Sequence, residues 1–277
     1  MTDGRPRIAL LVHGGLCNRL NAILSAIALL KKIGGGKIEL RVYWEKTHDC
    51  HAWFDELFQP DICEGIRVER ACRLYLRHSR KRNLYIPDIL RRIMFDASYL
   101  GTDIRDKDFV ALVGSKKKVF IESYNRFCPY TIESRLADYF RPIPLIEDRI
   151  KSVVDNFAPH TIGVHIRRTD NSVAIENSPL QSFVLSMDKA VDTDPQCMFY
   201  VATDDVEVKK QLIGRYGQRV VSPCYDLRRN STQGMRDAVV DLFCLASTKE
   251  ILGSTYSTFS TDAAAIYDIP LTIVKKV

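Results

Sequence analysis

Short apolar runs rich in β-branched residues alternate with helix-forming segments along most of the chain. Near the N-terminus, residues 7–13 are typical of a buried strand and residues 16–32 of a helix that follows Gly14 and Gly15. Residues 38–44 are typical of a second strand. Strand, glycine turn, helix and strand together predict the βαβ unit of a parallel sheet.

The second half of the chain alternates more regularly. This regularity predicts a second, doubly wound parallel sheet with helices on both faces. Strands are expected at 161–166, 197–202, 219–222, 250–253 and 271–274, and helices at 147–156, 179–191, 206–216, 237–247 and 259–267.

The middle of the chain is less regular. Residues 109–113 and 118–122 favour strands, and residues 131–139 favour a helix. The stretch Arg141-Pro-Ile-Pro144 breaks the pattern and is interpreted as a linker. The sequence therefore predicts two α/β domains. One is an N-terminal Rossmann-like domain at 1–145 with an irregular basic insertion near 60–110, and the other a C-terminal Rossmann-like domain at 146–277.

Positive charge is concentrated in one segment. The 277-residue chain has a formal net charge of +6, and residues 65–92 alone carry eight arginines and one lysine against Glu69 and Asp88. Arg67, Arg70, Arg73 and Arg77 recur at helical spacing, which favours a solvated basic helix face. The alternative is a surface for a polyanion or an acidic acceptor, but no nucleic-acid-binding motif is recognisable and no nucleic-acid partner is expected.

Composition argues for a protein without a membrane span. No apolar run approaches the roughly 20 residues that a transmembrane helix needs, and residues 8–12 are too short a run for a signal peptide. We therefore expect a cytoplasmic location, with the eight cysteines reduced. The group His48-Asp-Cys50-His51, with Cys63, matches none of the common zinc-ligand spacings, so no metal is expected there.

Polar residues follow three predicted strands of the second half. The first strand ends in His165, Arg167, Arg168 and Asp170, the second in residues 203–205, and the fourth in residues 254–258 before a helix. Ligands of open α/β sheets bind beyond the carboxyl ends of strands, and arginine forks and helix N-termini both bind phosphate. Together these groups predict a diphosphate pocket. The alternative for Arg167 and Arg168 is a pair of surface salt bridges.

These stretches carry a family resemblance. The sequence His165-Ile-Arg-Arg-Thr-Asp170 resembles the H-x-R-R-T-D signature of GDP-fucose-dependent fucosyltransferases of the α1,6 and nodulation types. Residues 201–205 resemble the second motif of that family. Residues 237–243, followed by 257–260, resemble the third motif. Residues 14–20 resemble its G-x-G-N-[RQ]-L loop, with Cys17 where a second glycine is usual.

The resemblance implies a glycosyltransferase-B fold with two Rossmann-like domains facing across a cleft. The C-terminal domain would bind GDP-fucose without a metal or other cofactor, and the partner would be a glycan or glycoconjugate acceptor. Arg167 would hold the β-phosphate and act in catalysis, helped by Ser257 and the amides near Thr258. The remaining substrate contacts would come from His165 and Asp241 to the guanosine part, from Asn18 to the diphosphate, and from Arg168, which could instead pair with Asp170.

The same resemblance implies transfer with inversion at the anomeric carbon. Glu176 lies one residue from the place of the catalytic base in the α1,6 enzymes, and Asp49 and Asp55 are alternatives. Other hypotheses remain open: another GDP-sugar as donor, a non-catalytic nucleotide-sugar- or glycan-binding protein, or nucleic-acid binding through residues 65–92. The D-x-D at 192–194 could hold a metal in another glycosyltransferase fold, but its position before Pro195 favours a surface turn.

Overall fold

The computed structural model describes residues 7–34, 38–104, 107–115, 118–129, 134–169 and 172–276. The chain divides into two compact units. The N-terminal unit comprises residues 1–134, 138–141 and 229–235, and the C-terminal unit comprises residues 135–137, 142–228 and 236–277. Residues 229–235, which the sequence pattern assigns to the second domain, thus group with the first unit. There, the backbone N–H of His51 donates to the carbonyl of Arg229 (3.1 Å).

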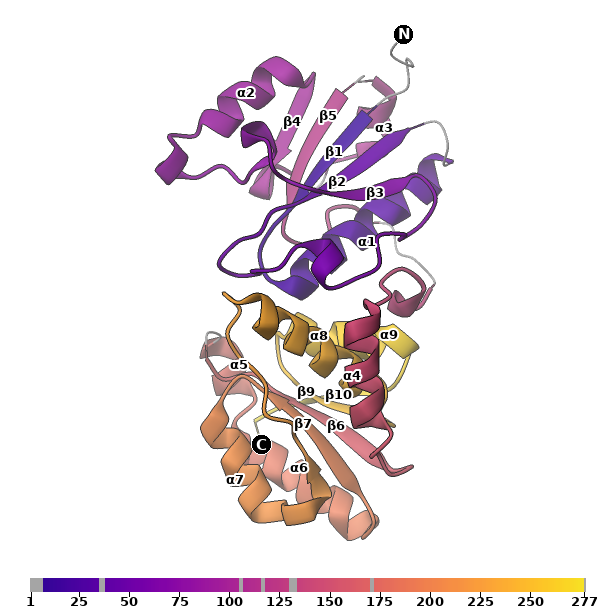
Figure 1. The fold of residues 1–277 in the computed structure, drawn as a ribbon, viewed down its shortest axis with the longest axis vertical. Coiled ribbons are helices and arrows are strands. Elements are labelled where there is room, and N and C mark those ends of the chain that lie inside the picture. Colours follow the sequence, from indigo (N-terminus) through magenta and orange to yellow (C-terminus); the bar gives the residue numbers. More distant parts are fainter. Residues whose placement is uncertain are drawn as a thin grey trace. The chain divides into compact units, whose positions relative to one another are not determined.

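The N-terminal unit is built on a five-stranded parallel sheet with the order β3-β2-β1-β5-β4 (Figure 1). Central strand β1 is almost wholly buried, which explains its unbroken run of apolar residues. Leu10 in β1 pairs with Val42 on one side and with Ile121 on the other. The strands are β1 (Arg7–Val12), β2 (Glu39–Trp44), β3 (Ile66–Arg70), β4 (Ala97–Leu100) and β5 (Lys118–Ser123).

Three helices accompany this sheet. Helix α1 (Leu16–Ile33) is rich in alanine and leucine and is buried along most of its length against β1 and β2. It ends at Gly34, whose φ of 91° places it in the left-handed conformation that glycine adopts readily. Helix α2 (Ile86–Met94) lies beside β4, and α3 (Phe109–Ser115) contacts α1.

The C-terminal unit contains a second five-stranded parallel sheet, with the order β10-β9-β6-β7-β8 (Figure 1). Every residue of central strand β6 is buried, and its apolar side chains pack in a core with β7, α6 and α7. The strands are β6 (Thr161–Ile166), β7 (Met198–Thr203), β8 (Val220–Val221), β9 (Ile251–Ser254) and β10 (Leu271–Val274). The helices are α4 (Pro144–Val154), α5 (Ser172–Asn177), α6 (Leu180–Thr193), α7 (Val206–Tyr216), α8 (Thr232–Ala246) and α9 (Thr258–Tyr267).

The strands and helices of the second half agree with those predicted from the sequence. In the middle of the chain several predicted elements are wrong. Arg67 and Arg70 lie in strand β3, so the helical spacing of the arginines does not mark a helix. Residues 109–113 form helix α3 and not a strand, and residues 134–139 contain only a short 3-10 turn, Leu136–Asp138. Glu176 lies in a short helix, α5, that the sequence pattern does not predict. Strand β3 pairs with β2, and helix α3 packs against α1, so contacts with distant residues override the local pattern in these two segments.

The remaining sequence expectations concern cysteines and membrane spans. All eight cysteines are free thiols. In the described parts of the chain, no helix combines the length and the hydrophobicity needed to cross a membrane.

Candidate functional site

Three strand ends of the C-terminal unit are joined around Arg167. The backbone N–H of Arg167 donates to the Ser254 hydroxyl at 3.0 Å, and that hydroxyl donates to the carbonyl of His165 at 3.2 Å. The Nε of Arg167 lies 3.4 Å from a carboxylate oxygen of Asp204. Strands β6, β7 and β9 therefore fix the backbone of this arginine and orient one edge of its guanidinium.

Asp204 organises the loop that follows β6. Its carboxylate accepts the backbone N–H of Arg168 at 2.7 Å and the hydroxyl of Thr169 at 2.8 Å, and it also faces Arg167. One carboxylate thus holds three consecutive residues of the predicted motif. The sequence places Asp204 at the end of a predicted strand, but the site residues predicted from the sequence do not include it.

Arg168 has a different environment from Arg167. Its Nη1 donates to the carbonyl of Ser178 at 3.0 Å, and its Nη2 is buried with no hydrogen-bond partner among the described residues. Burial lowers the pKa of Arg168, although Asp204 opposes this. Asp170, the partner expected from the sequence, lies outside the described residues. Arg168 therefore ties the loop to Ser178, which also binds the carbonyl of Val274 in β10.

His165 is a buried, neutral imidazole at the end of β6. Its Nδ1 lies 2.7 Å from the hydroxyl of Ser260, and its ring stacks on Phe259 with 4.8 Å between the ring centroids. Burial, reinforced by the charge of Arg167, lowers the pKa of His165 to about 4. His165 therefore connects β6 to the first turn of α9.

Helix α9 begins beside this group. Ser257 occupies the N-cap position but makes no side-chain capping bond, and Thr258 is the first helical residue. The preceding Tyr256 has a φ of 54° and is 75% exposed. A left-handed tyrosine is strained, and such strain is common in loops that bind ligands. The first turn of α9 carries the positive end of the helix dipole.

Asp241 lies in a second cluster, on α8. The hydroxyl of the fully buried Tyr200 donates to its carboxylate. Burial is the main cause that raises the pKa of Asp241 to about 7, while Tyr200 and Lys209 oppose the shift and nearby Asp237 adds to it. Asp237 itself is paired with Arg149. The Asp241 carboxylate is therefore a desolvated hydrogen-bond acceptor, and its charge changes near neutral pH.

Glu176 is exposed on the surface of α5. The two alternative candidates for the catalytic base lie in different surroundings. Asp55 is ion-paired with Arg70 at 2.7 Å, whereas Asp49 lies 3.8 Å from His48. The D-x-D ends at the C-terminus of helix α6 and not at a strand end, and Asp194 contacts His160. The structure thus offers no strand-end geometry for a metal at 192–194.

In the N-terminal unit, Asn18 lies in the first turn of α1, close to the glycine turn. Gly14 has a φ of 81°, and a methyl group placed on it would lie 3.4 Å from the Asn18 side-chain nitrogen. The neighbouring Arg19 is fully buried and donates to the carbonyl of Gly14 and the hydroxyl of Thr47. Arg19 therefore anchors the turn that presents Asn18.

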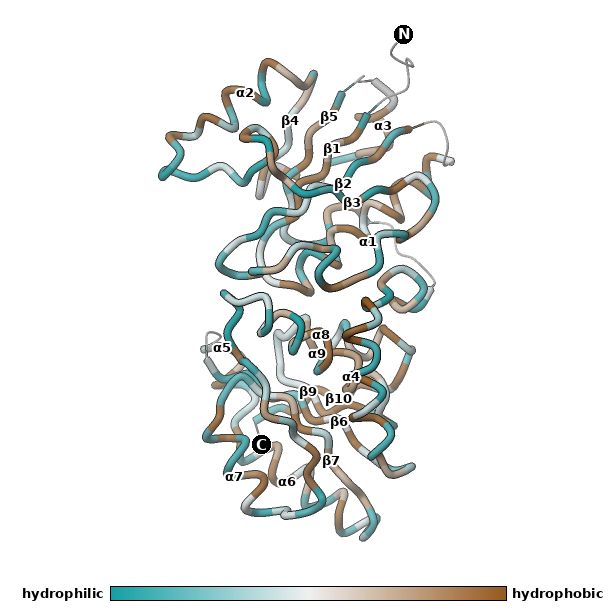
Figure 2. Tube along the Cα trace, viewed as in Figure 1, coloured by the Kyte–Doolittle hydropathy of each residue, from teal (hydrophilic) through white to brown (hydrophobic). Residues whose placement is uncertain are grey.

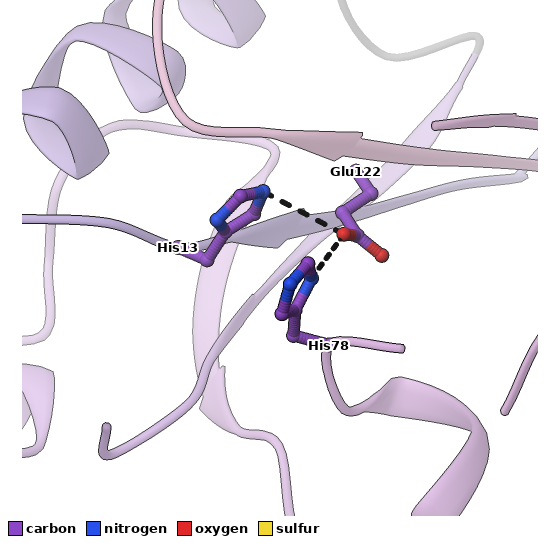
Figure 3. A group of neighbouring side chains, drawn as sticks. All are labelled: His13, His78 and Glu122. Carbon is purple, nitrogen blue, oxygen red and sulfur yellow. Dashed lines mark hydrogen bonds and ion pairs between the residues drawn. The ribbon is translucent and has the colours of Figure 1, made fainter. Parts of the chain in front are cut away.

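A further group in this unit, His13, His78 and Glu122, could in principle converge on a metal ion (Figure 3). However, Glu122 already contacts His78 and, at 2.8 Å, the guanidinium of fully buried Arg91. Burial lowers the pKa of His13 to about 4, and nearby arginines contribute. The positive surroundings oppose a cation, so we interpret the group as a charge-compensated network that needs no metal.

The sequence predicts no metal at the group His48, Cys50 and His51. Cys50 is fully buried, whereas His48 and His51 are exposed. Among the described residues, the ligand atoms that converge belong instead to His13, His78 and Glu122.

Comparison with known proteins identifies the architecture. No family model and no curated protein sequence matches the chain. Among solved structures, the chain is similar to the NodZ α-1,6-fucosyltransferase soaked with GDP-fucose, with 18% identity, 95% of this chain and 93% of that chain covered, and a TM-score of 0.62. The chain has the glycosyltransferase-B fold of the fucosyltransferases.

Two further structures of this fold support the same assignment. POFUT1 in complex with GDP is 13% identical, with 99% of both chains covered and a TM-score of 0.59. A mutant of Arabidopsis thaliana FUT1 in complex with GDP is 11% identical, with 96% of this chain and 69% of that chain covered and a TM-score of 0.60. The fold expected from the four sequence motifs is therefore confirmed.

Proposed function

We propose that the protein is an inverting, metal-independent glycosyltransferase that moves fucose from GDP-fucose to a hydroxyl group of a glycan or glycoconjugate. The observation that carries this proposal is the fixed position of Arg167 at the carboxyl ends of β6, β7 and β9. The fold supports it, because solved structures of this fold include complexes with GDP and GDP-fucose.

Arg167 is proposed to bind the β-phosphate of the donor. When the bond between C1 of fucose and the phosphate oxygen breaks, negative charge grows on GDP. A guanidinium held in place before the reaction stabilises that charge without reorganisation. Ser257 and the amides near Thr258, at the start of α9, would add hydrogen bonds and positive potential to the same phosphate.

The guanosine part is assigned to His165 and Asp241. An ionised carboxylate on Asp241 accepts the N–H groups of guanine, whereas the neutral His165 offers a ring that carries no competing charge. Asn18 is proposed as a further contact of the diphosphate. Arg168 is a positioning residue, because its contacts hold the loop that carries Arg167.

Glu176 is the proposed general base. In the proposed step, the acceptor O–H gives its proton to Glu176, the acceptor oxygen bonds to C1, and the C1–phosphate bond breaks with its electron pair leaving on GDP. Glu176 is exposed on α5, so its carboxylate is accessible to an acceptor. Asp49 and Asp55 are the alternatives, and Asp55 would first have to leave Arg70.

A thermal-shift panel of GDP, GDP-fucose, GDP-mannose and UDP-sugars tests the donor class. A ligand that binds only the folded protein raises its melting temperature. We expect stabilisation by GDP and GDP-fucose and none by UDP-sugars, followed by release of GDP from GDP-fucose in the presence of a glycan panel. Stronger stabilisation by GDP-mannose would identify a different donor. Binding of GDP-fucose without any turnover would favour a non-catalytic binding protein.

The raised pKa of Asp241 predicts a pH dependence of GDP binding. Only the ionised carboxylate accepts the guanine N–H groups, so affinity should decrease below pH 7, approaching about tenfold per pH unit. Asp241→Asn should lower GDP affinity about tenfold to a hundredfold and remove this pH dependence. Titration calorimetry between pH 5.5 and 8.5 measures both effects.

Asp241→Asn should lower the affinity for GDP but raise the stability of the protein without ligand. The pKa of Asp241 is about 7 in the folded protein against 3.8 for an unperturbed group, so the folded state binds more protons between these values. Stability contributed by this group therefore decreases as pH rises from about 4 to about 7. The asparagine side chain of the variant titrates in neither state, so the apo variant should melt above the wild type at pH 8. A lower melting temperature at that pH would contradict the proposed environment of Asp241.

A further inference from the structure

Helix α2 presents its apolar side chains to solvent and buries a charged one. Arg91 is fully buried, whereas Ile86, Ile89 and Ile93 are 39%, 58% and 78% exposed. Three residues at this spacing form one stripe along a helix, and Arg91 is two residues from both Ile89 and Ile93, which places it on the other side. The polarity of α2 is thus the reverse of that of an ordinary surface helix.

The inner side of α2 is held firmly. The guanidinium of Arg91 donates to the carbonyl of Tyr75 at 2.8 Å and to the Glu122 carboxylate at 2.8 Å, and it lies 4.1 Å from the ring centroid of Phe120. Its other nitrogen contacts the carbonyl of Arg77. These contacts fix the rotation of the helix, so the isoleucines face outward because of a specific buried network.

The turn that precedes α2 extends the exposed stripe. Leu84 is 75% exposed and Tyr85 is 51% exposed, and both have left-handed backbones with φ of 54° and 55°. Two consecutive non-glycine residues in this conformation are strained. Strain of this kind is retained where the surrounding structure enforces it and is a marker of functional segments. We call Leu84, Tyr85, Ile86, Ile89 and Ile93 the α2 face.

Cations border the α2 face. Arg80, Lys81 and Arg82 precede it in the chain, Arg92 flanks it on the helix, and all four are exposed. The acid of the helix, Asp88, is paired with Arg91 at 3.3 Å. Hydrophilic and hydrophobic stretches follow one another along this segment (Figure 2). Helices that lie in the plane of a membrane interface combine an apolar stripe with flanking cations in this way.

We propose that the α2 face docks on the surface of an anionic lipid bilayer. The five apolar side chains would enter the headgroup region, and the four cations would contact lipid phosphates. The helix has nine residues, which suits an interfacial position and is far too short to span the bilayer. A nucleic acid would also attract the cations, but it gives no environment for exposed isoleucines, so the apolar stripe favours lipid.

Co-sedimentation of the full chain with vesicles tests the proposal. We expect binding to phosphatidylcholine vesicles that contain phosphatidylglycerol, weak binding to phosphatidylcholine alone, and loss of binding in high salt. Ile89→Ser with Ile93→Ser should reduce vesicle affinity more than about tenfold. Lys81→Gln with Arg82→Gln should reduce it about fivefold for each charge removed. An unchanged urea-unfolding curve, followed by the fluorescence of Trp44 and Trp53 in the same unit, reports that these variants are folded.

The matched control is Leu145→Ser with Leu185→Ser, two exposed leucines of the C-terminal unit that lie on helices α4 and α6. These substitutions remove similar exposed apolar area and should leave vesicle binding unchanged. Absence of binding to anionic vesicles at low salt would overturn the proposal. So would binding that survives the isoleucine substitutions, or self-association or nucleic-acid binding through the α2 face without vesicle binding. None of these outcomes depends on the proposed donor.

Discussion

Replacing Arg167 with lysine or alanine is expected to reduce the proposed fucosyl transfer about a hundredfold to a thousandfold, the typical effect of removing one preorganised donor from a developing anion. The loss should appear in kcat, because the interaction strengthens as charge moves onto the departing GDP. We therefore expect each Arg167 variant to lose less in its affinity for GDP than in kcat.

Lysine should fail although it keeps the charge. An ammonium group is a single point of charge and cannot present two parallel N–H bonds to a phosphate. It also lacks the Nε that faces Asp204 at 3.4 Å. The backbone contact to Ser254 and the Asp204 bonds to the next two residues do not involve the replaced side chain, so the loop should keep its conformation.

Release of GDP from GDP-fucose, with melting temperature as the measure of folding, is the appropriate assay for both Arg167 variants. The matched control is Arg215→Lys, because Arg215 is an exposed arginine of the same unit that also pairs with an aspartate, Asp188. That control should retain activity. Near-full activity in Arg167→Lys would show that this side chain does not stabilise the leaving group.

The strand ends of the C-terminal unit could be predicted because the relevant information is local. Each buried strand of a parallel sheet gives a continuous apolar run, and the polar residues directly after it must lie at the same edge. His165, Arg167 and the start of α9 were found in this way. The contribution of Ser178 could not be found, since its contacts to Val274 and Arg168 depend on tertiary packing and not on any spacing in the sequence.

The helix expected in the basic segment, residues 65–92, is a wrong prediction for a related reason. Arg67 and Arg70 match a helical period, yet they lie in β3 because that strand pairs with β2. Ala71 and Leu76 then pack on Ala9 and Phe120 of the sheet. The position of the segment is set by Arg91 and Glu122, which are 31 residues apart in the sequence. No periodicity reports a buried ion pair of this kind.

Breaking the ion pair between Arg91 and Glu122 is the second change with a large expected effect. Arg91 is fully buried and Glu122 is 3% exposed. Among the described residues, Arg91→Met therefore leaves a buried carboxylate whose remaining ion-pair contacts are with His78 and His13. Breaking a buried ion pair by removing one partner typically costs about 3 to 5 kcal/mol. We expect a loss of this size in the unfolding free energy of the N-terminal unit. Both tryptophans of the chain, Trp44 and Trp53, lie in that unit, so their fluorescence during urea unfolding reports it.

A second substitution separates the charge from the packing. Glu122→Gln removes the buried charge but keeps an oxygen that can accept from His78. If the cost of Arg91→Met is mainly the stranded carboxylate, the double variant Arg91→Met with Glu122→Gln should be more stable than Arg91→Met alone, and the coupling energy should be about 1 to 3 kcal/mol. Simple additivity of the two changes would instead assign the loss to the packing of Arg91 on Phe120 and to its bonds with Tyr75. In that case the orientation of α2 would depend on the shape and hydrogen bonds of the arginine, and the charge of Glu122 would have no part in it.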